Sequence, residues 1–379
     1  MDFTCLDTEN ADSDNPVFSS ISTKHIDLEN PEHVDNGFNE QDFANKVAAS
    51  VNHNASDLHL CTGYHPVLRI DGDLKTFTHW PRIHPGWLNS LSQHLLNEVQ
   101  QRQLQQDGQV DCACTTSAGQ RLRANIFQQQ QGRSIAFRVI SATNPSLDEL
   151  DVPPIISQLI EQENGLILVT GATGSGKTTT LSAMISAMNQ RQSRHIITLE
   201  DPIEFLHRSQ SCLIQQRELG CHTHSFSSAL SGALRQDPDI ILLGELRDQE
   251  TIRLALTAAE TGHLVLATLH TRSATQAIDR LVDVFPAAEK TVIQAQLAAS
   301  LRAVIAQKLC HKVGGGRTAV FEIMTQTAAA SHLIREGKTY QLPSVIQTGA
   351  QWGMQTFEQG IARRQKQGVL AEHYTSQYT

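Results

Sequence analysis

The sequence contains no long hydrophobic run. Among its 379 residues there is no uninterrupted apolar stretch of about 18, the length that suggests a membrane-spanning helix. Residues 1–7 are acidic, whereas a signal peptide begins with basic residues and continues with an apolar segment. We therefore expect the protein to stay in the cytoplasm.

Paired cysteine motifs are also missing. The chain has seven cysteines and no CxxC spacing, which is typical of reduced thiols rather than of a disulfide framework or a zinc ribbon. The Cys112-x-Cys114 pair is the nearest approach to a metal motif. Because no second ligand pair stands nearby, we interpret it as two small side chains on one face of a strand.

The main body of the chain lacks an excess of either charge. The net charge is −9, and residues 1–40 hold ten acidic residues and one lysine, which leaves 29 residues of each sign in the remainder. Nucleic-acid binding usually needs a basic excess that displaces counterions. We therefore expect no nucleic-acid partner, although a local stripe in a ring pore would escape this count.

Composition divides the chain into a tail and two folded units. Residues 1–40 are rich in Asp, Asn, Ser and Glu without apolar periodicity, which predicts a disordered acidic tail or, alternatively, a docking peptide. Residues 41–140 predict a small α+β domain, and residues 141–154, with three prolines, predict a linker. We assign residues 155–370 to a second domain and residues 371–379 to a tail.

Hydrophobic patterning predicts the elements of both domains. In the first, helices are expected at residues 41–52 and 87–105, and strands at 57–61, 67–70, 109–115, 121–128 and 134–140. In the second, short apolar runs predict buried parallel strands of an α/β sheet at 166–170, 196–199, 240–243 and 264–267. Beyond residue 288 we expect helices and one strand at 318–323.

Residues 171–178 read Gly-Ala-Thr-Gly-Ser-Gly-Lys-Thr between an apolar strand and a helical run, which is the context of a phosphate-binding loop. The glycines let backbone N–H groups face the phosphates, Lys177 adds a positive charge, and the Thr178 hydroxyl suits Mg²⁺. ATP and Mg²⁺ are therefore the expected ligands. The expected nucleotide-binding residues are Gly171, Ala172, Thr173, Gly174, Ser175, Gly176, Lys177, Thr178 and Thr179.

Carboxylates follow two of the predicted strands. The strand at 240–243 ends in Gly244-Glu245, so Glu245 should emerge at the carboxyl edge of the sheet and polarise the attacking water; Asp237 and Asp239 could instead be caps. The cluster at residues 200–204 follows the strand at 196–199. There we expect Glu200 and Asp201 to help hold Mg²⁺ or water, with structural caps as the alternative.

His270 and a set of arginines complete the candidate groups. His270 closes the strand at 264–267 and should reach the edge where a γ-phosphate would lie, which makes it a candidate sensor; a packed histidine is the alternative. Four arginines lie on two adjacent strands of the first domain. They could act as fingers across a subunit boundary or be ordinary solvated residues: Arg121, Arg123, Arg133 and Arg138.

These segments together resemble the secretion and pilus ATPase superfamily. The phosphate-binding loop is its Walker A motif, residues 198–205 (Thr-Leu-Glu-Asp-Pro-Ile-Glu-Phe) resemble its aspartate box, 234–248 its Walker B motif and 261–271 its histidine box. By these motifs the family's functional residues fall on Lys177, Glu204, Glu245 and His270. Arg123 and Arg138 fall in the family's arginine strand pattern.

Within the superfamily, the sequence is most similar to the retraction ATPases of type IV pili. The similar segments are residues 55–59, 69–73, 333–338, 346–349 and 353–356, and the resemblance covers roughly residues 42–370. It implies a homohexamer in which a PAS-like α+β domain precedes a RecA-like P-loop domain with C-terminal helices. It further implies a peripheral place at the inner membrane, docked on a platform protein and acting indirectly on pilin.

The sequence departs from that pattern in three places. The acidic tail is extra, Cys221-His222 stands where an Asp is usual, and residues 329–332 (Ala-Ala-Ser-His) replace the usual Ala-Ile-Arg-Asn. The last departure concerns a segment associated with retraction rather than with hydrolysis. Pilus-assembly or type II secretion ATPases are therefore one alternative, and a nucleic-acid translocase and a regulatory nucleotide-binding protein are two others.

Overall fold

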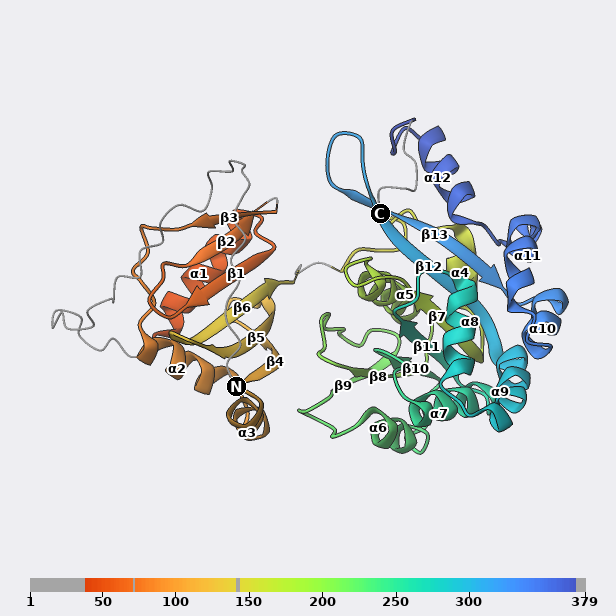
Figure 1. Ribbon diagram of the computed structural model, residues 1–379, viewed down its shortest axis with the longest axis horizontal. Helices are drawn as coiled ribbons and strands as arrows, with labels where there is room; N and C mark the ends of the chain where they lie inside the picture. The colour runs from red at the N-terminus through yellow and green to blue at the C-terminus, as the bar shows by residue number, and fades with distance from the viewer. Residues whose placement is uncertain (1–37, 71, 141–143, 373–379) are drawn as a thin grey trace, which may run out of the picture. The chain divides into compact units, whose positions relative to one another are not determined.

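The structure is a computed structural model that describes residues 38–70, 72–140 and 144–372 (Figure 1). Nearly all of the predicted acidic tail, and most of the predicted C-terminal tail, lie outside these residues. Two β-sheets organise the described part of the chain, one of six strands and one of seven. None of the helices in the described ranges is both long enough and apolar enough to cross a membrane.

The six-stranded sheet is antiparallel and has the order β3-β2-β1-β6-β5-β4. Its strands are β1 (Asp57–Cys61), β2 (Val67–Ile70), β3 (Asp73–Thr76), β4 (Gln109–Thr115), β5 (Arg121–Gln129) and β6 (Gly132–Val139). Alternate residues such as Leu58 and Leu60 are fully buried against the helices α1 (Glu40–Asn52), α2 (Pro85–Leu95) and α3 (Glu98–Asp107). The other face therefore carries the polar residues.

The prediction of a single helix at residues 87–105 is wrong, because the structure has two helices in this region, α2 and α3. Helix α2 ends at Leu95, and Asn97 starts α3 by accepting a hydrogen bond from the backbone N–H of Gln100. The Gln100 side chain in turn accepts from the backbone N–H of Asn97, which completes a capping box. The Asn-x-x-Gln spacing is a signal in the sequence that could have revealed this break.

The seven-stranded sheet has the order β13-β12-β7-β11-β10-β8-β9. It is parallel except that β13 runs antiparallel to β12. Its strands are β7 (Gly165–Thr170), β8 (His195–Glu200), β9 (Leu213–Glu218), β10 (Ile240–Leu243), β11 (Leu264–Leu269), β12 (Leu301–His311) and β13 (Arg317–Thr325). The four predicted parallel strands are confirmed, and with them the expected α/β class.

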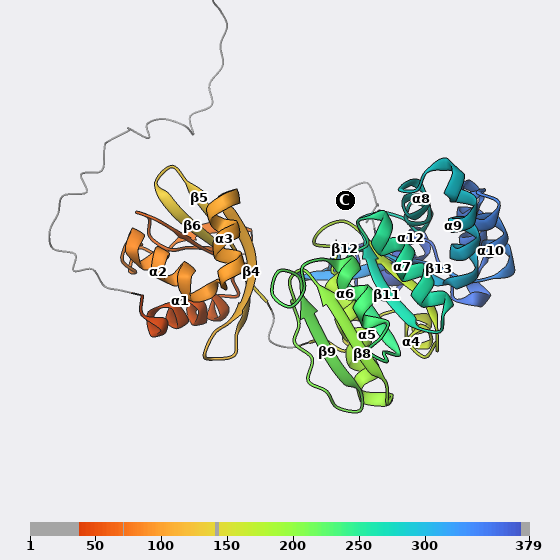
Figure 2. The same ribbon diagram turned by 90° about the horizontal axis from the view of Figure 1, so that it is seen from below.

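Helices cover both faces of this sheet (Figure 2). Ile167 and Val169 of β7 pack toward α4 (Pro154–Leu159) and α5 (Lys177–Arg191). Leu166 and Leu168 pack on the opposite side. The helices of that side are α6 (Phe226–Ala233), α7 (Gln249–Glu260), α8 (Ala274–Asp283), α9 (Ala287–Ser300), α10 (Ala328–Arg335) and α11 (Leu342–Thr348). Because both faces are covered, the central strands β7, β10 and β11 are buried at every residue.

The C-terminal part differs from the expected run of helices. Residues 301–311 form the long strand β12, which pairs with both β7 and β13. The expected strand at 318–323 is present within β13. Helix α12 (Phe357–Lys366) packs its Phe357 and Ile361 against Ala306, Cys310 and Val320 of this hairpin. Two short 3₁₀ helices, η1 (Thr339–Gln341) and η2 (Ala350–Trp352), link the last helices.

Candidate nucleotide-binding site

The predicted phosphate-binding loop connects β7 to the start of α5. Gly171 and Gly176 in this loop have φ values of 151° and 88°. A Cβ atom added to Gly171 would lie 2.3 Å from the carbonyl oxygen of Gln307 and 2.5 Å from the Ser175 Oγ atom. Only glycine fits there, so the loop can keep its backbone turned toward a ligand.

Ser175 gives an independent indication that the loop is built to bind a polar ligand. Its side chain is buried, and its Oγ atom has no hydrogen-bond partner in the described part of the chain. A buried hydroxyl without a partner is costly in a folded protein. Its place within the phosphate-binding loop fits a phosphate oxygen as the partner, so the loop is suited to a nucleotide.

Lys177 lies at the start of α5 and is almost completely buried, with 8% of its surface exposed. Its Nζ atom donates hydrogen bonds to the carbonyl oxygens of Gly171 (2.8 Å) and Ala172 (3.1 Å). Burial lowers the pKa of Lys177, and the carboxylates of Glu245 and Glu204 partly offset this effect. A cation with so little solvent around it favours an anionic ligand.

Gln307 of β12 supports the loop through two hydrogen bonds, a role that was not predicted from the sequence. Its Nε2 atom donates to the carbonyl oxygen of Ser175, and its Oε1 atom accepts from Thr180 Oγ1, both at 2.8 Å. The side chain is buried. The only signal in the sequence is an amide that follows the apolar residues 303–306, which does not by itself indicate a role.

The structure brings three of the predicted site residues together. Glu245 follows β10 and His270 follows β11, and these two strands are neighbours in the sheet. The His270 Nε2 atom lies 3.4 Å from Glu245 Oε1, and the His270 Nδ1 atom lies 3.4 Å from Lys177 Nζ. The imidazole ring therefore connects the lysine of the loop with the candidate catalytic carboxylate.

The acidic residues at the end of β8, Glu200 and Asp201, contact different partners and do not meet at a single site. Glu200 Oε1 accepts hydrogen bonds from Thr198 Oγ1 (2.6 Å) and Gln216 Nε2 (3.1 Å), and burial raises the pKa of Glu200 to about 7. Asp201 instead faces Arg247, at 3.9 Å between Oδ2 and Nη1. Within the described residues, no group of three or more His, Cys, Asp and Glu residues is arranged to hold a metal ion.

Arg123 and Arg138, two of the predicted arginines, differ in the segments that they contact. Arg123 lies between Glu204 (3.8 Å) and Asp111 (4.0 Å), whereas Arg138, its direct partner in the β5–β6 register, forms an ion pair with Asp57 at 3.2 Å. Arg123 is thus in contact with the aspartate-box segment, and Arg138 is held by its own sheet.

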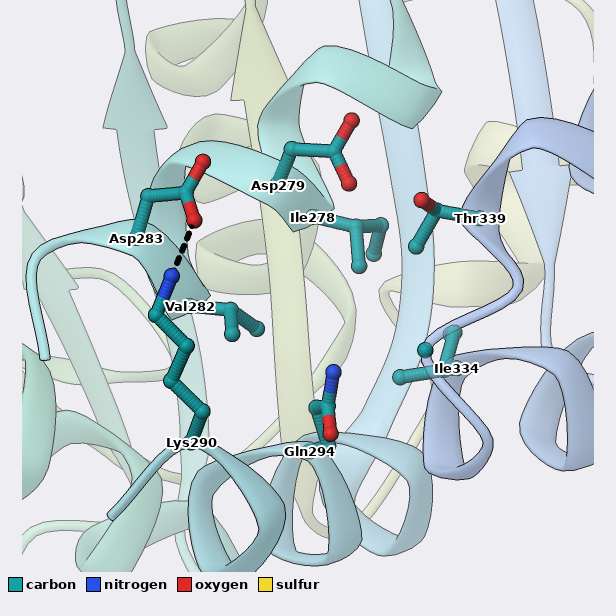
Figure 3. Close-up of a pocket in the computed structure, with 9 residues that line it drawn as sticks. Ile278, Asp279, Val282, Asp283, Lys290, Gln294, Ile334 and Thr339 are labelled. Atoms are coloured by element: carbon teal, nitrogen blue, oxygen red, sulfur yellow. Dashed lines mark hydrogen bonds and ion pairs between the residues drawn. The ribbon is translucent and has the colours of Figure 1, made fainter. Parts of the chain in front are cut away.

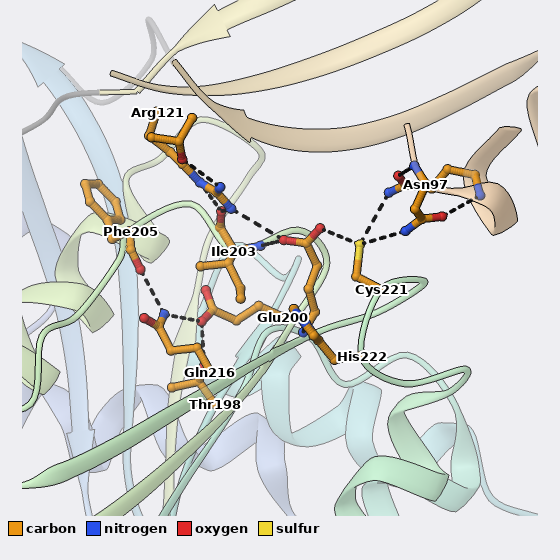
Figure 4. Close-up of polar contacts among 12 residues, drawn as sticks. Asn97, Arg121, Thr198, Glu200, Ile203, Phe205, Gln216, Cys221 and His222 are labelled. Carbon is orange, nitrogen blue, oxygen red and sulfur yellow. Dashed lines mark hydrogen bonds and ion pairs between the residues drawn. The ribbon is translucent and has the colours of Figure 1, made fainter. Parts of the chain in front are cut away.

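Arg121 reaches the same segment by another route (Figure 4). Its Nη2 atom donates to the carbonyl oxygen of Ile203 at 2.9 Å and lies 3.5 Å from the buried carboxylate of Glu218. Glu218 also accepts from the backbone N–H of Ile203 and from the thiol of Cys221. Cys221, at one of the departures from the family pattern, therefore lies in this polar cluster.

A cavity of about 160 Å³ lies elsewhere, between α8, α9 and η1 (Figure 3). Ile278, Val282 and Ile334 form its apolar wall, and Asp283 at its rim pairs with Lys290 at 2.6 Å. None of the predicted site residues lines this cavity. It is therefore separate from the candidate nucleotide-binding site.

Comparison with known proteins decides the family. Residues 32–373 match the family described as type II/IV secretion system protein. The chain belongs to this family. The phosphate-binding loop and the ATPases among its relatives make it an ATPase.

Three relatives show how far the similarity extends. The chain is 54% identical to the uncharacterised protein YggR of Escherichia coli K12, over 86% of this chain and 98% of that protein. It is 46% identical to the type IV pilus retraction ATPase PilT of Pseudomonas aeruginosa, over 87% of this chain and 96% of that one. A crystal structure of the pilus retraction motor PilT with bound ADP matches with a TM-score of 0.79 and 40% identity, covering 86% of this chain and 93% of that one.

Proposed function

We propose that this chain is the subunit of a hexameric ATPase that powers retraction of a type IV pilus or a closely related fibre. The observation that carries the proposal is the connection of Lys177, His270 and Glu245 through two contacts of 3.4 Å, beside a loop whose first residue has room only for glycine. The alignment along 96% of the PilT retraction ATPase supports retraction as the work performed.

The residues can be assigned to steps of ATP hydrolysis. The backbone N–H groups of residues 171–179 and the ammonium of Lys177 bind the phosphates. Glu245 orients the attacking water and accepts its proton, with Glu204 assisting, and His270 senses the γ-phosphate because it contacts both Lys177 and Glu245. Arg123 and Arg138 supply positive charge to the transferring phosphoryl group at a subunit boundary.

Mg²⁺ is the proposed metal cofactor, and it would neutralise charge on the phosphates. Thr178, in the first turn of α5, is the residue that would bind it directly through its hydroxyl. Asp201 and Glu200 would act through water, because Glu200 already accepts two hydrogen bonds and Asp201 faces Arg247.

The proposed partners follow from the same family. They are five further copies of this chain in a ring, an inner-membrane platform protein that holds the ring at the membrane, and, indirectly, pilin. No nucleic acid is expected.

In α10 the departure at residues 329–332 places Ala330 in the core, while Ala329 and His332 are exposed. The departure therefore changes a surface as well as a packed position.

The test replaces Glu245 with Gln in the cell's own copy of the gene and measures retraction, surface motility, ATPase activity and oligomeric mass. We expect an intact hexamer that hydrolyses ATP at least 100-fold more slowly, with pili that persist but do not retract. Glu260→Gln, an exposed glutamate at the end of α7, is the matched control. Loss of pili would indicate assembly instead, and unaffected pili would refute a pilus function.

A further inference from the structure

Arg247 lies two residues after Glu245 and contacts two carboxylates at once. Its Nε atom is 2.7 Å from Glu245 Oε2, and its Nη1 atom is 3.9 Å from Asp201 Oδ2. The two acidic residues come from different strands, since Glu245 follows β10 and Asp201 follows β8. One guanidinium group therefore bridges the ends of two neighbouring strands.

The backbone beneath Glu245 is fixed on both sides. The N–H group of Gly244 donates to the carbonyl oxygen of Leu199 at 2.7 Å, and the Thr268 hydroxyl donates to the carbonyl oxygen of Gly244. The N–H group of Leu246 donates to the carbonyl oxygen of Thr268 at 3.0 Å. The main freedom left to Glu245 is therefore rotation of its own side chain.

The two oxygens of Glu245 face different groups. Oε2 is bound by Arg247, while Oε1 lies 3.4 Å from His270, whose other ring nitrogen is 3.4 Å from Lys177. Only Oε1 is thus directed toward the phosphate-binding loop. A glutamate without such a partner would have to give up rotamer freedom each time it adopted this orientation.

We propose that Arg247 is a positioning residue, which binds one oxygen of Glu245 and anchors it to Asp201 so that the other oxygen faces the phosphate-binding loop. This inference rests on the proposed role of Glu245 in hydrolysis. The contacts of Arg247 suit such a role, because a planar guanidinium can bind two carboxylates through separate nitrogens, which a lysine cannot do.

A competing role for Arg247 would be direct binding of the γ-phosphate. Its side chain is 61% exposed, compared with 20% for Glu245 and 36% for Asp201, so the group lies on the open side of the site. The two roles differ in what they change. A positioning residue affects kcat and leaves nucleotide binding unchanged, whereas a phosphate ligand affects the binding of ATP more than that of ADP.

The experiment compares full-length Arg247→Ala with the unmodified protein for kcat, KM, oligomeric mass and the Kd values of ADP and a non-hydrolysable ATP analogue. We expect kcat to fall at least tenfold, with both Kd values and KM within twofold and the oligomer intact. Arg253→Ala, which removes an arginine paired with Glu289, is the control and should leave kcat unchanged. If Arg247→Ala does not fold, Arg247→Lys is judged by the same criteria.

Two results would overturn the inference. The first is a kcat that falls less than tenfold. The second is a change in the state of the protein or its ligand binding: either a tenfold loss of affinity for the ATP analogue with ADP binding unchanged, or loss of the oligomer. Glu245→Gln measured in parallel separates the two proposals. If it retains turnover, the role of Glu245 fails; if it loses turnover while Arg247→Ala does not, only the role of Arg247 fails.

Discussion

Arg364 of α12 forms an ion pair with Asp151, in the segment that leads into α4, although the two residues are 213 positions apart. Its Nη2 atom also donates to the carbonyl oxygen of Asp151 at 2.7 Å, and the side chain is 2% exposed. Asp151 has a φ of 46°, a backbone conformation that is uncommon for a residue other than glycine. The last long helix thus fixes the entry to the seven-stranded sheet.

Replacement of Arg364 by Ala is expected to lower the free energy of unfolding by roughly 3 kcal/mol, because it empties a buried site and removes the partner of Asp151. Urea titration of the purified protein measures the change. Arg335→Ala, on the exposed side of α10, is the control and should cost less than about 0.5 kcal/mol. Equal stability of the two variants would show that the ion pair does not hold α12.

Replacement of Gln307 by Ala should weaken nucleotide binding about tenfold, because the Ser175 carbonyl and the Thr180 hydroxyl both lose a partner. Titration with a fluorescent ADP analogue gives the Kd. Gln296→Ala removes an amide that binds Glu260 on α7 and serves as the control, with an unchanged Kd. A Gln307→Ala protein that binds ADP as tightly as the control would exclude support of the loop by this side chain.

Gly171→Ala should abolish measurable ADP binding. The new Cβ atom would lie 2.3 Å from a backbone oxygen, which cannot move aside as a flexible side chain could. At Gly63, whose φ is 80° and which has no heavy atom within 4 Å of an added Cβ, the same change should cost about 1 kcal/mol of stability and no affinity. Calorimetric titration of both variants tests the difference, and binding by Gly171→Ala would contradict the geometry of the loop.

Acidification should destabilise the protein through His207. Burial lowers the pKa of this histidine to about 4, and its Nε2 atom lies 3.2 Å from Ser182 Oγ. Below pH 6.5 the unfolded chain binds a proton that the folded chain does not, so stability falls as the pH drops from about 6.5 to 4. The loss from this group is roughly 2 kcal/mol at pH 5 and roughly 3 kcal/mol at pH 4.

Melting temperatures at pH 7.5 and pH 5 measure this effect. The drop in melting temperature from pH 7.5 to pH 5 should be smaller for His207→Gln than for the unmodified protein. His311→Gln, which changes an exposed histidine at the end of β12, provides the comparison and should retain the full drop. Identical drops in all three proteins would rule out His207 as the source.

Local patterns were sufficient for much of the fold. The strands at 57–61, 67–70, 109–115 and 240–243 have the bounds that the sequence predicted, since each is a short apolar or alternating run next to turn residues. The proximity of Glu245 and His270 could also be predicted, because neighbouring parallel strands end at the same edge of a sheet.

The strands and contacts that were not predicted depend on interactions between segments far apart in the sequence. Residues 301–311 combine alanines with Arg302, Gln307 and Lys308, a composition that suits a helix, but pairing with β7 on one side and β13 on the other makes them a strand. Strands β3 and β9 lie at sheet edges and are mostly polar, so they lack an apolar period. Gln307 and Arg247 gain their contacts only in the folded chain.

The place of β7 between β12 and β11 has a thermodynamic consequence. Gln307 links the phosphate-binding loop to β12, and β12 with β13 supports α12. Any protein that binds the C-terminal helices and displaces β12 must change the affinity of the loop for nucleotide. By linkage, ATP or ADP then changes the affinity for that protein by the same factor, so the nucleotide state would set how long a bound partner remains attached.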